Sequence, residues 1–317
     1  MNAAENCNAK TSLGFGLNTP LIAAISANLL WGMTFLASKS TLAAWGPFTA
    51  AALRFLLATV FLYVGSWIFG QSISIPKSKK EWGGLFWVAL SSFGLLYPLQ
   101  LSGLQSISSS LSAVIMLTSP LFVVVFGWLF LKESIGASKI IAIALGMMGG
   151  VKLVSSSHGL TGVMEQWSST GALLTLLASV SLAASVIFTR RLSFKVSTTN
   201  LTFWSMLMGS VMLTILAFVF ERNKEFVVDD VNAWVALFFL ALVCSALCFF
   251  MWNYAIQKAS PKQIASTMHL KTPMAVILGI VLLEEHLSAG VWIGASLVMI
   301  GVGLSQLSVF KKASTGK

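Results

Sequence analysis

Ten runs of mostly apolar residues follow one another along the chain, joined by short polar loops. Each run is close to the length of about 20 residues that a helix needs to cross the hydrocarbon core of a bilayer. Backbone polar groups in lipid must be satisfied within the chain, so runs of this length are expected to be helical. The sequence therefore predicts an all-α integral membrane protein with ten transmembrane helices, over residues 20–38, 48–70, 83–101, 109–131, 138–154, 171–189, 200–220, 233–254, 262–283 and 288–308.

The composition indicates a surface that faces lipid. Only 9% of the residues are charged and 56% are hydrophobic, whereas about a quarter of the residues in a soluble domain are charged. The net charge of +10 would suggest a nucleic-acid partner if the basic side chains formed one patch. They fall instead in loops between the apolar runs, so we expect contact with the lipid bilayer and no contact with nucleic acid.

Lysine and arginine residues alternate in number from loop to loop. With a cytoplasmic N-terminus, the cytoplasmic segments hold 14 of the 20 basic residues, the outer segments hold four, and Arg54 and Lys271 lie within spans. This is the positive-inside pattern. It predicts a multi-pass protein of the cell inner (plasma) membrane with both termini in the cytoplasm. The first apolar run has no basic region before it, so we interpret it as a retained helix and not a signal peptide.

The two halves of the chain resemble each other at a constant offset of 152 in the numbering. The matched pairs include Trp82 with Trp234, Gln105 with Gln257, Met116 with Met268, Gly127 with Gly279, and Glu133 with Glu285. Each repeat holds five spans, an odd number, so the second copy is inverted relative to the first. Inverted repeats are typical of secondary carriers that alternate access around a midplane site. We therefore divide the chain into a cytoplasmic tail (1–19), two five-helix repeats (20–154 and 171–308) and a basic cytoplasmic tail (309–317).

Several short motifs are similar to those of a known family. They are Leu30-Trp31-Gly32, Leu53-Arg54-Phe55-Leu56, Ser119-Pro120-Leu121-Phe122 followed by Glu133, and Thr272-Pro273 followed by Glu285. Together with the Gly-rich fifth span, they resemble the EamA-type repeat of the drug/metabolite transporter (DMT) superfamily. The resemblance implies a secondary carrier without a bound cofactor, in many cases an exporter of amino acids or other metabolites. It also implies that spans one, three, four, six, eight and nine surround the central cavity.

Lys271 is the most informative side chain, because it lies near the middle of the ninth span. A lysine at the centre of a membrane costs about 2.5–3.5 kcal/mol even on lenient insertion scales. The repeat places Ser119 at the matching position, so the charge breaks the internal symmetry. We expect Lys271 to face a cavity and to bind an anionic group of the substrate. The alternative is that its ammonium snorkels or binds backbone carbonyls.

Two prolines, Pro120 and Pro273, lie at comparable depths in spans four and nine. A proline frees the carbonyl four residues earlier, here those of Met116 and His269, and this carbonyl must then find a partner or line a wet cavity. The two prolines are therefore candidate hinges, although a simple kink would explain them equally well.

Polar and aromatic side chains gather in the spans that the resemblance assigns to the cavity. Asn28 with Trp31, and Tyr97 with Gln100, share helix faces at a spacing of i,i+3, and Asn253 lies near the end of span eight. Amide and indole groups can orient a substrate by hydrogen bonds, so we include them as candidate substrate-binding residues. Packing between helices is the alternative. His269 is a further candidate, because it could exchange a proton at physiological pH.

Arg54 lies about two turns inside span two and has no intramembrane carboxylate as a partner. We expect a structural role, with backbone carbonyls or the outer Glu284 as partners. The alternative is a role in gating or in binding an acidic group.

Other classes of function have little support. The spans contain no Asp or Glu, and the three histidines are scattered, so no catalytic group is recognisable. A Walker-type loop is absent. Cys244 and Cys248 lack further ligands nearby, so we predict no metal and no cofactor. Small-residue ridges at Gly146 and Gly294 indicate either close helix packing or the face of a homodimer. We expect a non-ATP carrier that exports a small polar metabolite, with a membrane receptor or scaffold as the alternative.

Overall fold

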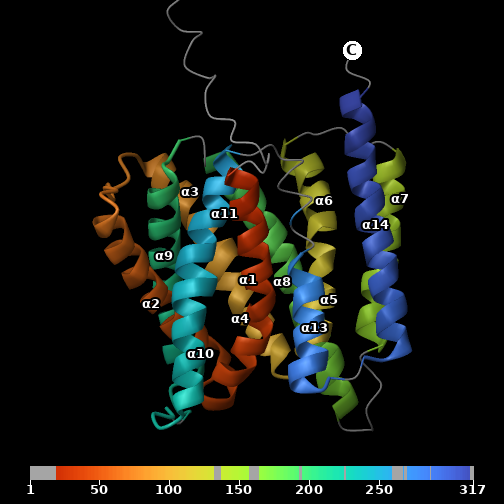
Figure 1. Ribbon diagram of the computed structural model, residues 1–317, viewed down its shortest axis with the longest axis horizontal. Coiled ribbons are helices and arrows are strands. Elements are labelled where there is room, and N and C mark those ends of the chain that lie inside the picture. The colour runs from red at the N-terminus through yellow and green to blue at the C-terminus, as the bar shows by residue number, and fades with distance from the viewer. Residues whose placement is uncertain are drawn as a thin grey trace, which may run out of the picture.

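The computed structural model describes residues 19–131, 137–156, 164–192, 195–224, 226–258, 267, 270–285 and 287–314. All regular structure in these residues is helical, and the long helices stand side by side (Figure 1). Seven helices of the described part are long and apolar enough to cross a membrane. Two more, Lys271–Leu283 and Ala289–Gly301, are apolar but shorter. The prediction of an all-α membrane protein is confirmed.

The first five predicted spans correspond to α1 (Thr19–Ala44), α2 (Pro47–Ile68), α3–η1–α4 (Lys79–Ala89, Leu90–Leu95, Leu96–Leu104), α5–η2–α6 (Ser109–Ile115, Met116–Thr118, Ser119–Leu131) and α7 (Ala137–Ser156). The second five correspond to α8 (Met164–Leu192), α9 (Thr198–Phe220), α10–η3–α11 (Val231–Ala241, Leu242–Leu247, Cys248–Lys258), α13 (Lys271–Leu283) and α14 (Ala289–Ser314). The ninth predicted span, 262–283, is described in its second half.

The internal repeat is visible in the helix boundaries. α10 and η3 begin and end at the same offset from α3 and η1 that separates the matched side chains. The boundaries of α13 stand at this offset from those of α6, and the start of α14 stands at this offset from the start of α7. The offset found from scattered side chains is therefore an offset between two copies of the same structural unit.

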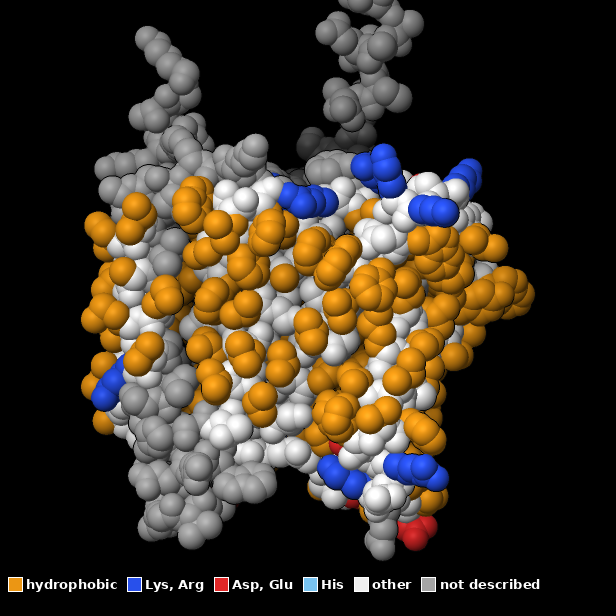
Figure 2. Space-filling view, turned by 180° about the vertical axis from the view of Figure 1, so that it is seen from behind, with side chains coloured by type: hydrophobic (Ala, Val, Ile, Leu, Met, Phe, Trp, Pro, Cys, Tyr) orange, Lys and Arg blue, Asp and Glu red, His pale blue; other side chains and the backbone are white. Residues whose placement is uncertain are grey.

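The start of α1 and the end of α14 lie at the same end of the bundle, here called the terminal end; the opposite end is called the far end (Figure 1). Between the two ends, hydrophobic side chains form a broad band, with lysine and arginine gathered mainly above and below it (Figure 2). Trp67, Val60 and Ile215 are among the exposed apolar side chains. Exposed apolar surface on this scale needs lipid as its solvent.

Spans three and eight each contain one segment of π-helix, η1 and η3. A π-helix shifts hydrogen bonds from i→i+4 to i→i+5, so it leaves backbone groups free for other partners. In η3, the carbonyl of Cys244 accepts a hydrogen bond from the Trp31 indole at 2.9 Å. In η1, the carbonyl of Ser91 accepts one from the Ser181 hydroxyl at 2.9 Å. These segments join helices of different repeats.

The helices α7 and α14 pack closely at one edge of the bundle (Figure 1). A Cβ added at Gly149 would lie 2.8 Å from the Gly294 carbonyl oxygen, and one added at Gly146 would overlap a methyl carbon of Leu121. The small residues therefore allow close packing within the chain, which is the scaffold role predicted for them.

Candidate functional site

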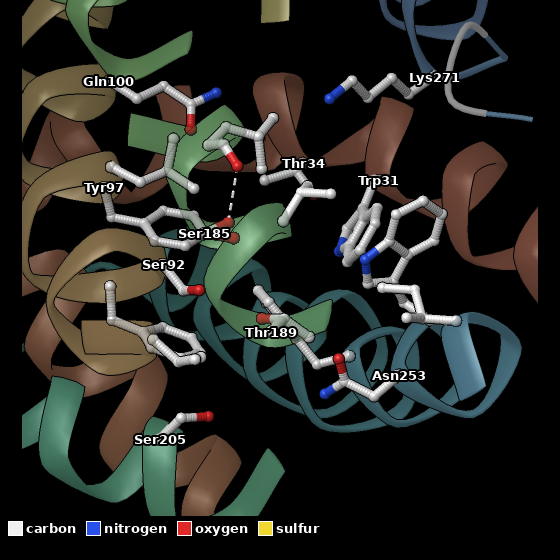
Figure 3. A pocket seen from close by; sticks show the side chains of 18 of the residues that line it. Trp31, Thr34, Ser92, Tyr97, Gln100, Ser185, Thr189, Ser205, Asn253 and Lys271 are labelled. Carbon is white, nitrogen blue, oxygen red and sulfur yellow. Dashed lines mark hydrogen bonds between the residues drawn. The ribbon is translucent and has the colours of Figure 1, made fainter. Parts of the chain in front are cut away.

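A cavity lies among helices of both repeats, with an empty volume of about 900 Å³ that includes the solvent at its mouth (Figure 3). The cavity is lined by residues from spans one, three, four, six, seven, eight and nine: Asn28, Trp31, Thr34, Phe35, Val88, Ser92, Phe93, Leu96, Tyr97, Gln100, Met116, Leu182, Ser185, Val186, Thr189, Leu201, Ser205, Phe249, Trp252, Asn253, Ile256 and Lys271.

The cavity gathers six of the seven residues predicted to bind substrate: Asn28, Trp31, Tyr97, Gln100, Asn253 and Lys271. The seventh, His269, lies outside the described residues. Binding of a substrate by these residues stays a prediction, but their convergence on one cavity is a property of the fold.

The sequence did not indicate a contribution from span seven, where α9 supplies Leu201 and Ser205. It also missed the hydroxyl groups of Thr34, Ser92, Ser185 and Thr189. Serine and threonine are common in membrane helices, where they bond to the preceding turn, so their presence alone carries little information. The one available signal was spacing, because Thr34 continues the face of Asn28 and Trp31.

The hydrogen-bond donor of Trp31 serves the fold. Its indole N–H donates to the Cys244 carbonyl at 2.9 Å, and its ring packs edge-on against Phe249 and Trp252, with centroids 5.3 and 5.5 Å away. Trp31 therefore presents ring surface to the cavity. The sequence predicts an indole that orients the substrate by a hydrogen bond, but the Trp31 donor is already used within the bundle.

The two asparagines also use donors within the bundle. Asn28 donates through its amide nitrogen to the Ala24 carbonyl at 2.8 Å and to the Thr267 hydroxyl at 3.3 Å. Asn253 donates to the Thr202 hydroxyl at 2.6 Å. The amide oxygens of both residues are left as neutral acceptors on the cavity wall.

Gln100 and Lys271 differ from these residues, because their polar groups are free. Figure 3 shows the Gln100 amide and the Lys271 ammonium pointing toward each other across the cavity. Neither has a hydrogen-bond or ion-pair partner among the residues that the structure describes. Gln100 is 8% exposed and Lys271 is half-buried. The geometry agrees with a cavity-facing Lys271 and gives no carbonyl partner for its ammonium within the described chain.

Lys271 is the first residue of α13, and its counterpart Ser119 is the first residue of α6. The Ser119 hydroxyl turns back to its own chain and donates to the Met116 carbonyl at 2.8 Å. The longer lysine side chain extends from the equivalent break into the cavity. A cation at the start of a helix is disfavoured by the helix dipole, so an anion bound there would relieve both the dipole and the buried charge.

The comparisons with known proteins agree with this architecture. The model of the EamA-like transporter family matches residues 18–155 and again residues 169–306. The chain belongs to the EamA-like transporter family. An uncharacterized transporter of Synechocystis is 28% identical over 88% of this chain and 87% of its own length. The uncharacterized inner membrane transporter YedA of Escherichia coli is 26% identical over 92% of each chain.

A solved structure supports the same fold for this EamA-like chain. It covers 92% of this chain and 98% of its own, with a TM-score of 0.67 and 18% sequence identity. Similarity at this level of identity concerns the fold alone.

In this EamA-like bundle, Arg54 lies outside the cavity lining and is 1% exposed. Its Nε donates to the Ser245 hydroxyl at 2.8 Å and its Nη2 to the Cys244 carbonyl at 3.4 Å. Its guanidinium also lies 4.9 Å from the centre of the Tyr97 ring. These contacts join α2 to the π-helix of span eight. Glu284, expected as an alternative partner, is instead exposed at the end of α13.

The prolines of the EamA-like motifs mark the helix breaks. Pro120 follows the short 3₁₀ segment η2 and lies in the first turn of α6, and the freed Met116 carbonyl is bonded by Ser119. Pro273 lies in the first turn of α13, and the carbonyl that it frees, on His269, falls outside the described residues. The break at Pro120 is observed, and hinge motion at either proline stays a prediction.

At Gly32, within the first motif, α1 crosses α13 at close range. A Cβ on this residue would lie 2.6 Å from Met274 Cβ and 2.8 Å from the Lys271 carbonyl oxygen. Because real Cβ atoms do not approach so closely, only glycine allows α13 to hold Lys271 at this distance from α1.

The sequence did not predict the capping roles of two carboxylates at the far end. Glu221 accepts hydrogen bonds from the backbone N–H and hydroxyl of Thr49, both at 2.7 Å, and so caps α2. Glu285 accepts from the backbone N–H groups of Ser109 and Ser110 at 2.7 and 2.9 Å, and so caps α5. Burial by itself would raise the pKa of Glu285, but the hydrogen bonds from Ser110 and Ser109 outweigh it and hold the pKa below its ordinary value.

Within the described residues, no group of three His, Cys, Asp or Glu side chains is placed to hold a metal ion. Cys244 and Cys248 are buried free thiols. Both contribute to packing around the π-helix of span eight.

Proposed function

We propose that this EamA-like protein is a secondary carrier that exports a small polar metabolite, such as an amino acid or an amino-acid derivative, across the inner membrane. The observation that carries the proposal is the central cavity, which is lined by α1, α3, η1, α4 and η2 of the first repeat and by α8, α9, α11 and α13 of the second. In an inverted repeat, rocking of one unit against the other exposes a shared midplane cavity to each side in turn.

The two ends of the cavity support a direction of opening. At the terminal end, the lining residues Thr189, Leu201 and Ile256 lie within about one turn of the ends of their helices. At the far end, the helices are tied together: Lys39 donates to the Ile107 carbonyl at 2.9 Å, and Glu285 caps α5. This arrangement suits a conformation that admits substrate from the terminal side and is closed on the far side.

The positive-inside pattern would make the terminal side cytoplasmic. Reporter fusions after Lys80, Lys195 and Lys317 are then expected to signal cytoplasm, and fusions after Ser106 and Lys224 to signal the outside. A cytoplasmic signal after Lys224 would contradict the inverted arrangement and with it the carrier proposal.

Transport is tested in two steps with the purified full-length chain. A thermal-shift screen against a metabolite library identifies ligands, since a ligand at 100 times its Kd stabilises a protein by about 2.7 kcal/mol. Counterflow of the labelled ligand in proteoliposomes without ATP then tests carriage. A carrier is expected to exchange the ligand. A ligand that binds at the cavity but is never exchanged would favour a receptor and contradict the proposal.

A further inference from the structure

The charge on the described wall of the cavity is positive. Among the described residues that line it, Lys271 is the only charged side chain. The ten Asp and Glu residues of the chain all lie outside the ten spans predicted from the sequence, and residues 259–270, next to Lys271, contain none. A carboxylate placed beside Lys271 gains a charge-assisted hydrogen bond. An ammonium group of the same molecule would meet a like charge and, on the described wall, no acid to neutralise it.

Two polar side chains without a partner among the described residues, Gln100 and Lys271, project into the cavity. The Gln100 amide faces the Lys271 ammonium across the space (Figure 3). These two groups can both donate to an anionic group that lies between them. Because a carboxylate has two oxygens and about four acceptor sites, it can accept hydrogen bonds from both at once.

The rest of the wall is largely apolar and includes a group of aromatic rings. Trp31, Phe249 and Trp252 pack edge to face, and Phe93 lies 5.1 Å from Phe249 between ring centres. The Trp31 indole N–H is already bonded to Cys244, and the Ser205 hydroxyl to the Leu201 carbonyl at 2.6 Å. The oxygens that remain on the wall, among them the amide oxygens of Asn28 and Asn253, are neutral and are weaker partners for a full positive charge than a carboxylate would be. A wall of this kind favours an apolar or aromatic body.

We infer that the substrate is a monocarboxylate with an apolar, ring-sized body and no ammonium group. This inference rests on the proposed carrier function and narrows it to amino-acid derivatives whose amine has been removed or acylated. Lys271 holds the carboxylate together with Gln100, and the aromatic side chains hold the body.

Four probes of one shape separate the contributions: 3-phenylpropanoate carries only the carboxylate, phenylalanine carries both charges, phenethylamine carries only the ammonium, and 3-phenylpropanol carries neither. We expect 3-phenylpropanoate to stabilise the purified full-length protein at concentrations at least tenfold lower than the other three. Equal or tighter binding of phenylalanine or phenethylamine would overturn the inference, as would the absence of binding by all four at any soluble concentration.

Variants at position 271 test the origin of the preference. Lys271→Met is expected to keep the fold, because it removes a buried charge, and to lose the preference for 3-phenylpropanoate over 3-phenylpropanol. Lys271→Arg should retain that preference with weaker binding. Lys80→Met, which removes an exposed lysine at the start of α3, should leave binding unchanged. A preserved preference in Lys271→Met would contradict the assignment.

Counterflow separates this inference from the carrier proposal. If 3-phenylpropanoate binds through Lys271 but is not exchanged in proteoliposomes, the inferred ligand class is right and the carrier proposal is wrong. If an ammonium-bearing compound is exchanged and 3-phenylpropanoate is not bound, the carrier proposal is right and the inferred substrate class is wrong.

Discussion

The carboxylate of Glu285, just beyond the end of α13, accepts hydrogen bonds from both the backbone N–H and the hydroxyl of Ser109, at 2.7 and 2.8 Å. The two residues belong to different repeats and are 176 positions apart. They join the end of one central helix to the start of its neighbour at the far end of the bundle. If the cavity opens toward the far side, either these hydrogen bonds must break or the two helix ends must move together.

Removing the carboxylate should weaken the far end. Glu285→Gln is expected to lower the free energy of unfolding by about 0.5–2 kcal/mol, the usual value of a helix N-cap. Glu284→Gln is the matched control, because Glu284 is the preceding residue and its carboxylate is exposed. Thermal unfolding of the two variants at neutral pH provides the comparison. Equal melting temperatures would show that the Glu285 contact adds nothing to stability.

The same contact should be sensitive to acid. The folded-state pKa of Glu285 lies below its ordinary value, so its contribution to stability is complete above the unfolded value of about 4.3 and disappears as pH falls through the lower folded value. Wild type should therefore lose more stability than Glu285→Gln between neutral pH and about pH 3. Equal losses of stability in the two proteins would show that Glu285 does not contribute to the acid sensitivity.

Arg54 should matter to folding more than to ligand selection. Arg54→Ala leaves the Ser245 hydroxyl without its donor, while the Cys244 carbonyl keeps its hydrogen bond from the Trp31 indole. A buried unsatisfied group costs about 1–3 kcal/mol. We expect a clear fall in the yield of monodisperse protein by size-exclusion chromatography, and a smaller fall for Ser245→Ala. Arg222→Ala, at an exposed position just beyond α9, serves as control. Normal yield with loss of ligand binding would favour a binding or gating role instead.

Gly32 should tolerate no side chain. Gly32→Ala forces α1 away from α13, because the new Cβ meets the backbone of Lys271 at 2.8 Å. Overpacking of this kind costs about 1–3 kcal/mol, and we expect reduced ligand affinity as Lys271 moves. In contrast, a Cβ at Gly65 meets nothing within 4 Å, so Gly65→Ala should be neutral or gain about 0.5–1 kcal/mol. Equal melting temperatures of the two variants would argue against the close crossing.

The ring of Trp31 should contact the ligand, whereas its indole N–H should stabilise the fold. Trp31→Phe is expected to lose about 0.5–1.5 kcal/mol of stability with the hydrogen bond to Cys244, while ligand affinity falls only slightly. Trp67→Phe, at a position 79% exposed, controls for loss of indole surface. Both quantities can be read from melting curves with and without ligand. A large loss of affinity at unchanged stability would mean that the indole N–H serves the ligand.

Much of the architecture could be read from the sequence, because lipid restricts it so strongly. A backbone without water must be helical over about 20 residues at a time, and duplication left the same offset in the side chains and in the helix boundaries. The same reasoning singled out Lys271, since a charge at mid-membrane must face water, a partner or a ligand. The cavity residues of spans one, three and eight were found because amides and indoles are conspicuous among apolar neighbours.

Which of those groups are free was decided only by the tertiary structure. Trp31 and Gln100 are equally polar in the sequence, yet Trp31 donates to a carbonyl that a π-helix of the other repeat leaves available, while Gln100 meets open space. The cap of α5 by Glu285 depends in the same way on packing, because the end of α13 must lie beside the start of α5. Hydrogen-bond partners of this kind are fixed by the angle and register at which helices pack, and local sequence carries no record of either. The chain itself thus determined the spans, the inverted repeat and the buried charge, and packing determined which side chains are left to meet a substrate.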